Sequence, residues 1–255
     1  MIHPSAVIDP GAEIGEGCEI GPFCHIGADV HIGPRCRLIG HVTVFGPTRI
    51  GAENVFFPYT SIGQRSQDLK YAGEPTYLEI GDRNSFREFC TVNRGTSPGS
   101  KTIIGHDGNF LAYSHVAHDC TVGDHVIFSN NGTIAGHVLV EDHAVIGGLS
   151  GVHQFCRIGR HAIIGGCTKI VQDVPPYMIA DGNPAEIRGI NQVGLERRGF
   201  SADDTRALRE AYRQLYRSNL NVKQACEKIA AEPSQPEVIA HLLAFIESSQ
   251  RGIVR

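Results

Sequence analysis

The sequence predicts a mainly β protein, built as a parallel β-helix and followed by a short α-helical segment. An aliphatic or aromatic residue recurs at every sixth position through most of the first 170 residues, and glycine often follows it. After about residue 194 this pattern gives way to amphipathic helical spacing. Neither an α-helix nor a simple strand has a period of six. Hexapeptide repeats of this kind are typical of parallel β-helices.

The repeat keeps one phase from Ile8 to Ile170, with two interruptions. One hexad should form one flat wall and one corner, with the repeat residue and a small residue four positions later pointing inward. Three hexads then close a triangular coil, and the coils stack at strand spacing. We expect the glycines to supply the backbone angles of the corners. The repeat residues are Ile8, Ile14, Ile20, Ile26, Ile32, Leu38, Val44, Ile50, Phe56, Ile62, Ile80, Phe86, Val92, Ile104, Phe110, Val116, Val122, Phe128, Ile134, Val140, Ile146, Val152, Ile158, Ile164 and Ile170.

Most cysteines share a single slot of the repeat. A slot that points inward is better explained by small apolar side chains than by metal binding or disulfides. The sequence also has no Cys-x-x-Cys motif. We therefore expect structural thiols, no bound metal and no cofactor. The residues concerned are Cys18, Cys24, Cys36, Cys90, Cys120 and Cys156.

Two segments interrupt the repeat, from Gln64 to Tyr77 and from Gly95 to Lys101. Loops that leave a rigid scaffold tend to carry function. The repeat is expected to end at Val174-Pro175-Pro176-Tyr177, because paired prolines stop regular strand pairing.

Helical spacing begins at about residue 194. Together, the two changes of pattern predict a β-helix over residues 1–190 and a helical domain over residues 191–255.

The helical domain should contain three main helices. The first begins at Ser201, which precedes an acidic first turn typical of a helix start. The second spans Asn221 to Ala231, and the third spans Pro236 to Glu247. Arginines recur at three- and four-residue spacing along the first helix, at Arg206, Arg209, Arg213 and Arg217.

Composition excludes several function classes. The 255-residue chain has a formal net charge of −4, whereas nucleic-acid-binding surfaces usually need a basic excess. It has no apolar run long enough to span a membrane. The opening residues Met1 to Pro4 lack a secretory signal pattern. We therefore expect a cytoplasmic protein.

The histidines divide into two groups. His125, His143 and His161 are eighteen residues apart, so they should stack in one structural column on the surface. His115, His118 and His137 instead lie within little more than one coil, close to the hexads that follow the loops. Imidazole can move protons near neutral pH. Asp119 should not orient His118, because neighbours on a strand point in opposite directions.

The chain resembles the hexapeptide-repeat acyltransferases, and among them the UDP-N-acetylglucosamine O-acyltransferases that begin lipid A synthesis. The likeness covers nearly the full length. It rests on Gln67 to Thr76, Asn93-Arg94-Gly95-Thr96, Ala117-His118-Asp119-Cys120-Thr121-Val122-Gly123, Ala135-Gly136-His137-Val138, Val152-His153-Gln154-Phe155-Cys156, Gln172-Asp173-Val174-Pro175-Pro176-Tyr177 and Arg197-Arg198-Gly199-Phe200. The resemblance implies a left-handed coil, opposite to the usual handedness of parallel crossovers. It also implies a homotrimer with sites between prisms, an acyl carrier protein as partner and a UDP-sugar as substrate.

The resemblance assigns roles by position. His118 would be the general base, and the backbone N–H of Gly136 would stabilise the oxyanion. Gly166 would leave the acyl groove open for a long 3-hydroxyacyl chain. The substrate-binding residues would be Asp68, Lys70, His115, His137, His153, Gln154, Asn191, Arg197 and Arg198.

Two positions depart from the family pattern. Val193 stands where an acidic residue near the uridine is expected, and Asn93 stands where a histidine is usual. Some relatives acylate a 3-amino sugar, so the acceptor could be a hydroxyl or an amine.

Two other functions remain open on the residues alone. A γ-type carbonic anhydrase would use the same scaffold to bind zinc and would lose activity with a chelator. A non-catalytic β-helix module would tolerate loss of His118. The arginine stripe favours the acyltransferase, because an acidic carrier protein would be steered by complementary charge.

Overall fold

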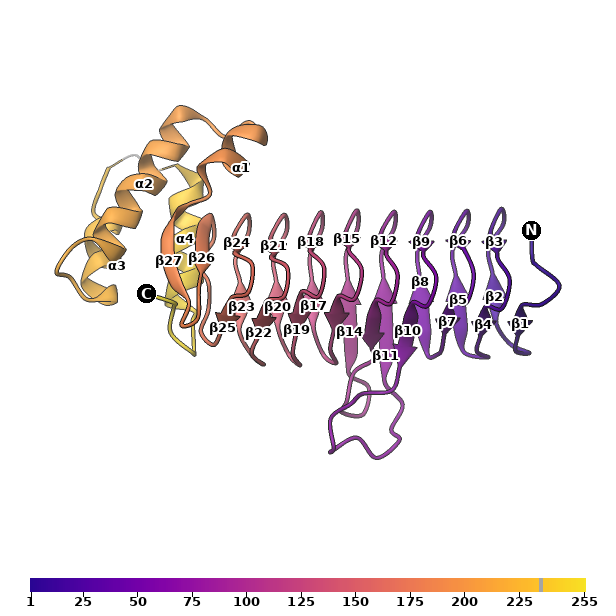
Figure 1. Ribbon diagram of the computed structural model, residues 1–255. Helices are drawn as coiled ribbons and strands as arrows, with labels where there is room; N and C mark the ends of the chain where they lie inside the picture. Colours follow the sequence, from indigo (N-terminus) through magenta and orange to yellow (C-terminus); the bar gives the residue numbers. More distant parts are fainter. Residues whose placement is uncertain (234–235) are drawn as a thin grey trace.

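The computed structural model describes residues 1–233 and 236–255. They form a long triangular prism of stacked coils, with the helices gathered at one end (Figure 1). The first sheet contains, in order, β1 (Val7–Ile8), β4 (His25–Ile26), β7 (Thr43–Val44), β10 (Ser61–Gln64), β13 (Thr91–Asn93), β16 (His115–Val116), β19 (Thr133–Ile134), β22 (Gly151–Val152) and β25 (Lys169–Ile170).

The other two walls of the prism are built in the same way. The second sheet contains β2 (Glu13–Ile14), β5 (Val30–Ile32), β8 (Thr48–Ile50), β11 (Tyr77–Ile80), β14 (Lys101–Ile104), β17 (Thr121–Val122), β20 (Leu139–Val140) and β23 (Arg157–Ile158). The third contains β3 (Glu19–Ile20), β6 (Arg37–Leu38), β9 (Val55–Phe56), β12 (Ser85–Phe86), β15 (Asn109–Phe110), β18 (Ile127–Phe128), β21 (Val145–Ile146), β24 (Ile163–Ile164), β26 (Met178–Asp181) and β27 (Glu186–Ile190).

The prism has three edges, which we name by a feature of each. The turns from the first sheet to the second form the His118 edge. Those from the second to the third form the histidine-stack edge, with His125, His143 and His161. Those from the third to the first form the Gly166 edge.

The pairing register explains how two loops leave the coil without disturbing it. Parallel neighbours are normally eighteen residues apart, as in the pairing of Ile26 with Val44. Ile62 instead pairs with Val92, and Val92 pairs with Val116, so the offsets are 30 and 24 residues. Both excesses are multiples of six, so each loop returns the chain in phase. Figure 1 shows the two loops projecting together from the middle of the prism.

The expected role of glycine was wrong for much of the repeat. The corners do use left-handed backbone angles, but non-glycine residues such as Phe23 (φ 57) and His41 (φ 52) adopt them. Glycine is needed elsewhere for close approach: a Cβ on Gly21 would lie 2.0 Å from the Ile39 carbonyl oxygen of the next coil. At Gly33 a Cβ would lie 2.6 Å from the carbonyl carbon of Gly51. These glycines therefore set the spacing between coils.

The interior of the prism is filled as the repeat predicts. The rings of Phe56, Phe86 and Phe110 stack along the third sheet with centroids 5.1 and 4.6 Å apart. The six cysteines of the shared slot are buried and free. Their burial agrees with the interpretation of this slot as a small apolar position.

The prism continues further than the two prolines suggested. Pro175 and Pro176 lie before β26, which pairs in parallel with β24 and so extends the third sheet. Strand β27 then adds an antiparallel partner to β26. The sequence missed both strands because they follow no six-residue spacing. The first helix begins just after β27, so the expected boundary at residues 190 and 191 falls in the connection.

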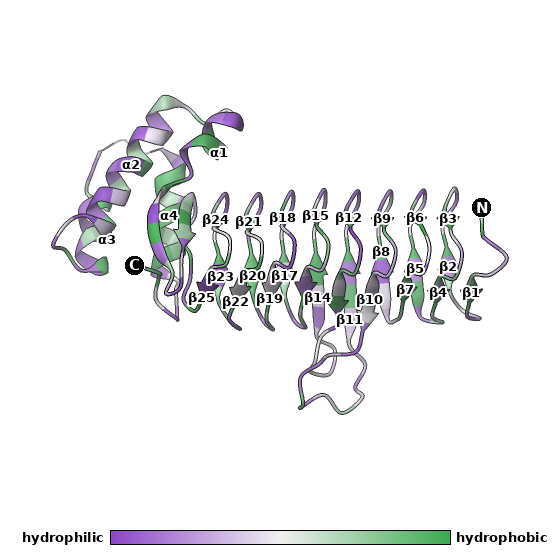
Figure 2. Cartoon of the chain, in the orientation of Figure 1, coloured by the Kyte–Doolittle hydropathy of each residue, from purple (hydrophilic) through white to green (hydrophobic). Residues whose placement is uncertain are grey.

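The helices follow the expected order, with one addition. They are α1 (Gln192–Arg197), α2 (Ala202–Tyr216), α3 (Val222–Ala230) and α4 (Glu237–Glu247). The short α1 was not predicted. Ser201 and Asn221 cap α2 and α3 through capping boxes. These capping residues explain why the starts of the two helices could be predicted from the sequence. Figure 2 shows hydrophobic residues concentrated along α4, whose apolar side chains are largely buried.

The opposite end of the prism is partly covered by the first residues. Ile2 forms a parallel bridge with Ile20 of β3, and the Met1 carbonyl accepts a hydrogen bond from the Ile20 N–H. Within the described ranges, no helix combines the length and apolar character needed to cross a membrane.

The predicted histidine column forms, but it does not lie wholly on the surface. The rings of His125, His143 and His161 stack at centroid distances of 4.7 and 4.6 Å. His161 is only 5% exposed, because Tyr177 and Phe200 pack against its ring. Burial, together with the neighbouring His143, lowers the pKa of His161 to about 4.

This shift predicts a pH-dependent stability. An unfolded histidine titrates near 6.5, so the unfolded chain binds a proton that folded His161 resists. The contribution is fully present above about pH 6.5 and is lost as the pH falls toward about 4. We expect the urea midpoint to fall less between neutral and acid pH in His161→Phe, which keeps a stacked ring. His125→Phe, at the exposed end of the stack, is the control. Equal pH dependence of His161→Phe and wild type would contradict the assignment.

Candidate active site

The His118 edge carries the densest group of sequence-predicted site residues. His118 lies in the turn between β16 and β17, and its side chain is 11% exposed. Its Nδ1 lies 2.8 Å from Oδ2 of Asp119. Because a carboxylate only accepts hydrogen bonds, Nδ1 carries the proton and Nε2 is left as the basic nitrogen.

The expectation that Asp119 could not orient His118 was wrong. It treated the pair as strand neighbours, whereas both residues lie in a corner turn and Asp119 has a φ of 59°. The left-handed turn brings the two side chains to the same side. Asp119 also accepts from the backbone N–H of Thr96, with distances of 3.2 and 3.1 Å to its two oxygens. Burial opposes its ionisation, but the surrounding hydrogen bonds prevail and the pKa of Asp119 is lowered.

Gly136 packs directly against the imidazole from the next coil. A Cβ at this position would lie 2.3 Å from Cε1 and 2.5 Å from Nε2 of His118. Any side chain would therefore displace the His118 ring. The amide N–H of Gly136 donates no hydrogen bond to any part of the chain that the structure describes.

His137 and His115 flank the same imidazole. The rings of His137 and His118 meet edge to face at 5.3 Å, and His137 stacks on Phe155 at 4.6 Å. His115, on β16, has its Nδ1 2.7 Å from the Thr91 hydroxyl. Burial, followed by the proximity of His118, lowers the pKa of His115. His115 is therefore neutral near pH 7 and can accept or donate a hydrogen bond without adding charge.

The first loop brings Asp68 and Lys70 to this edge. Asp68 Oδ2 lies 4.0 Å from His118 Nε2, on the side of the ring away from Asp119. Asp68 Oδ1 accepts from the backbone N–H of Lys70, whose own side chain is exposed. The imidazole therefore lies between two carboxylates, one at each nitrogen.

The side chains around His118 could also be considered as a metal site. Among the residues that the structure describes, His118, Asp119 and His137 offer ligand atoms that all lie within 4.8 Å of one another. Asp119, however, already accepts from His118 and from the Thr96 amide. This arrangement fits an oriented acid–base imidazole better than a three-ligand metal site.

The remaining predicted residues are not gathered around His118. His153 and Gln154 lie on the same edge in a later coil and are exposed. Asn191 belongs to the histidine-stack edge, where its Nδ2 donates to the His161 carbonyl and its Oδ1 accepts from the Gly194 N–H at the start of α1. Arg198 lies near that stack and is among the groups that lower the pKa of His161, after burial and His143. The neighbouring Arg197 is exposed.

Gly166 lies on the third edge, in the turn between β24 and β25. A Cβ there would meet only the Gly148 carbonyl oxygen, at 3.5 Å, so the space beside it is open. The predicted residues therefore occupy three different edges of one prism. A single chain does not bring them together.

The two departures from the family pattern have different surroundings. Asn93 is buried and donates from Nδ2 to the Arg65 carbonyl. It therefore links the end of β13 to the start of the first loop. Val193, on α1, is 58% exposed and leaves an apolar surface where an acidic residue was expected.

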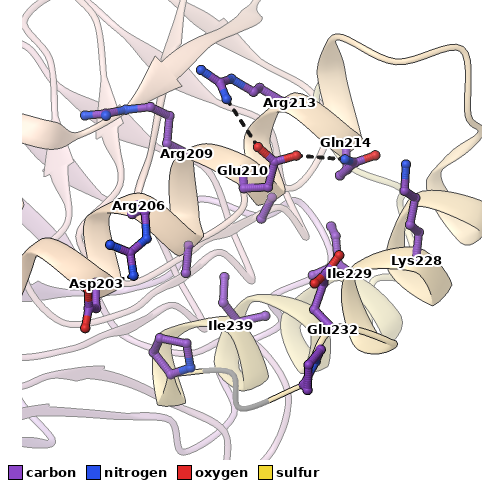
Figure 3. A pocket seen from close by; sticks show the side chains of 14 residues that line it. Asp203, Arg206, Arg209, Glu210, Arg213, Gln214, Lys228, Ile229, Glu232 and Ile239 are labelled. Atoms are coloured by element: carbon purple, nitrogen blue, oxygen red, sulfur yellow. Dashed lines mark hydrogen bonds and ion pairs between the residues drawn. The ribbon is translucent and has the colours of Figure 1, made fainter.

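The arginine stripe borders a groove of about 840 Å³ between α2, α3 and α4 (Figure 3). Arg206, Arg209 and Arg213 lie along it, and Ile229 and Ile239 contribute apolar walls. Asp203 pairs with Arg206 and Glu210 pairs with Arg213, so part of the positive charge is compensated. Arg217 lies off the groove, donating to the Tyr212 hydroxyl.

Sequence reasoning missed Asp119 and the Thr96 amide. A usable signal was present for Asp119, because its place in the hexad is the corner position rather than the wall. The contact from Thr96 depends on how the second loop folds back, which no local pattern encodes.

Comparisons with known proteins agree over the whole chain. The family model Udp N-acetylglucosamine O-acyltransferase, domain 2, matches residues 173–254, and the bacterial transferase hexapeptide model (six repeats) matches residues 11–46. An acyl-[acyl-carrier-protein]--UDP-N-acetylglucosamine O-acyltransferase from Verminephrobacter eiseniae is 49% identical over 215 residues, which is 82% of each chain.

Solved structures give the same result. LpxA from Acinetobacter baumannii is 47% identical with a TM-score of 0.95, covering 100% of this chain and 99% of its own. The UDP-N-acetylglucosamine O-acyltransferase (LpxA) from Moraxella catarrhalis is 44% identical with a TM-score of 0.96 and the same coverage. The chain therefore belongs to the UDP-N-acetylglucosamine O-acyltransferase family and has its left-handed parallel β-helix.

Proposed function

We propose that this acyltransferase moves a 3-hydroxyacyl chain from an acyl carrier protein thioester to the 3-position of UDP-N-acetylglucosamine, the first step of lipid A biosynthesis, with His118 as the general base. Acyl transfer from the carrier to the sugar nucleotide follows from the family. The observation that carries the role of His118 is its 2.8 Å contact with Asp119, which leaves Nε2 as the basic nitrogen. The proposal includes a cytoplasmic location.

The chemistry requires a base because a sugar hydroxyl is a poor nucleophile. Nε2 of His118 would remove the hydroxyl proton as the oxygen attacks the thioester carbon. The tetrahedral intermediate then collapses, the carbon–sulfur bond breaks, and the imidazolium returns the proton to the departing sulfur. Asp119 stabilises the imidazolium that forms between these steps. A 3-amino acceptor would follow the same course.

The developing oxyanion needs a donor that is already in place. Gly136 supports this role because its backbone contacts the imidazole ring and its N–H has no acceptor among the described residues. The absence of a Cβ also lets the thioester approach the imidazole.

The substrate-binding role of the remaining residues requires more than one chain. His118, Asn191 and Gly166 lie on three different edges of the prism. A threefold assembly, with sites in the clefts between prisms, would place edges of neighbouring chains together. We therefore propose a homotrimer in which Asp68, Lys70, His115, His137, His153, Gln154, Asn191, Arg197 and Arg198 contact the sugar nucleotide or the carrier thioester.

The groove beside α2 is our proposed dock for the carrier protein. Arg206, Arg209 and Arg213 offer charge to an acidic surface, and Ile229 and Ile239 offer apolar contact. Charge complementarity of this kind mainly accelerates association.

The role of His118 can be tested by His118→Ala. We expect the rate of acyl transfer to fall by roughly 100-fold or more, a typical loss for a general base, with little change in the urea midpoint. His125→Ala, which removes an exposed histidine of the stack, should retain activity. Turnover at the wild-type rate in His118→Ala would exclude the general-base role.

The role of Gly166 can be tested by Gly166→Met. A bulky side chain in the open space should shorten the preferred acyl chain, because each excluded methylene loses about 0.8 kcal/mol of burial. Product mass spectra from a mixture of acyl carriers would give the preference. Gly151→Met is a matched control, because a Cβ there also meets open space. An unchanged chain-length distribution in Gly166→Met would contradict the proposal.

The docking groove predicts a selective salt effect. Raising ionic strength screens surface charge, so KM should rise more for the acyl carrier than for the UDP-sugar. Arg209→Ala and Arg213→Ala should reproduce this increase, whereas Arg217→Ala, off the groove, should not. Equal responses of the two KM values would count against the dock.

A further inference from the structure

One pair of buried hydroxyls joins the two loops beside His118. The first loop runs from β10 to β11 and the second from β13 to β14. Ser66 Oγ and Thr96 Oγ1 lie 2.6 Å apart, and the two residues are only 5% and 7% exposed. The two hydroxyls are buried hydrogen-bond partners, so removing either one breaks this link between the loops.

Thr96 connects this pair to Nδ1 of the imidazole. Its backbone N–H donates to both oxygens of Asp119, and Asp119 Oδ2 accepts from His118 Nδ1 at 2.8 Å. A shift of the second loop would therefore move the carboxylate that orients the ring.

Ser66 connects the pair to the other side of the imidazole. Its Oγ accepts from the backbone N–H of Asp68 at 3.1 Å, and Asp68 Oδ2 faces His118 Nε2 at 4.0 Å. The Ser66–Thr96 contact thus joins the residue whose backbone N–H holds the Asp119 carboxylate to the residue whose hydroxyl holds the Asp68 backbone.

We propose that Ser66 and Thr96 are positioning residues for acyl transfer, which together hold Asp119 at Nδ1 and Asp68 opposite Nε2 of His118. The inference rests on the proposed role of His118 as general base. Neither hydroxyl contacts the imidazole, so both residues act through the carboxylates. Because the two loops are linked, binding of the acceptor sugar against the first loop would also fix the orientation of His118.

The geometry gives the link a direct catalytic consequence. A misplacement of about 1 Å in a reacting group can cost up to about 100-fold in rate. Besides the two carboxylates, the titratable groups that face His118 in the described part of the chain are His137 and His115. Neither histidine takes part in these hydrogen bonds, but His137 Nε2 lies 3.7 Å from Asp119 Oδ2, so loosening the loops moves negative charge relative to both rings.

The test compares Ser66→Ala, Thr96→Val and the double variant in the full-length enzyme. Thr96→Ser keeps the hydroxyl and serves as the conservative variant. The matched control is Ser61→Ala. It breaks the hydroxyl pair Thr43–Ser61, which joins two coils of the first sheet at 3.2 Å. The measurements are kcat and KM for both substrates, the pH dependence of kcat/KM, and the urea midpoint of each variant.

We expect Ser66→Ala and Thr96→Val each to lower kcat by about 10-fold, and the double variant to be no slower than the worse single one, because both remove the same contact. The acidic limb of the pH profile should move to lower pH, since a protonated imidazole loses carboxylate support. Thr96→Ser and Ser61→Ala should behave as wild type.

Three results would overturn the inference: independent effects that multiply in the double variant, an unchanged pH profile, or rate losses that merely track the urea midpoint. Its failure is separable from that of the proposed function. If His118→Ala is inactive while Ser66→Ala and Thr96→Val match wild type, only this inference fails. If His118→Ala retains full activity, the general base itself is wrong.

Discussion

Close contact between successive coils is the constraint on which the rest of the structure depends. Glycines such as Gly21 and Gly33 bring the backbone of one coil so near to the next that a single Cβ would collide with it. This contact accompanies strand pairing at a usual offset of eighteen residues and the stacked aromatic rings of the interior. Since each coil is held mainly by its neighbours, side chains at equivalent corners are fixed in depth and direction. The site uses that regularity: His118 and Gly136 face each other because they occupy the same corner position one coil apart.

Function appears where the chain departs from the repeat without losing its phase. The two loops insert multiples of six residues, so the coil continues unchanged while a lobe forms beside one edge. The corner turn itself supplies the partner of the imidazole, because its left-handed residue, which recurs throughout the repeat, places Asp119 against His118. A stiff scaffold thus provides the imidazole, its glycine neighbour and the Asp119 carboxylate, and the second loop provides the Thr96 amide that holds that carboxylate.

The sequence predicted the features that periodicity encodes. The six-residue spacing identified the β-helix and its inward cysteines, and the capping residues Ser201 and Asn221 located two helices. It failed where the chemistry was not periodic: at β26 and β27, at the short helix α1, and at the contact between His118 and Asp119. The sequence motif singled out His118, but the partners of its ring depend on loop conformation. The motifs assign Asn191 and Gly166 to the same site. In one chain, however, the two residues lie on different edges of the prism.

The unequal ends of the prism have a consequence for self-association. A stack of parallel coils resembles a fibril, and an open end offers unpaired backbone groups on which another chain could add. At one end, β27 and the helices block such growth. At the other, Ile2 pairs with β3, while β1 and β2 end their sheets as strands of only two residues. Short, incomplete edges make poor templates, so they disfavour the addition of another chain at this end.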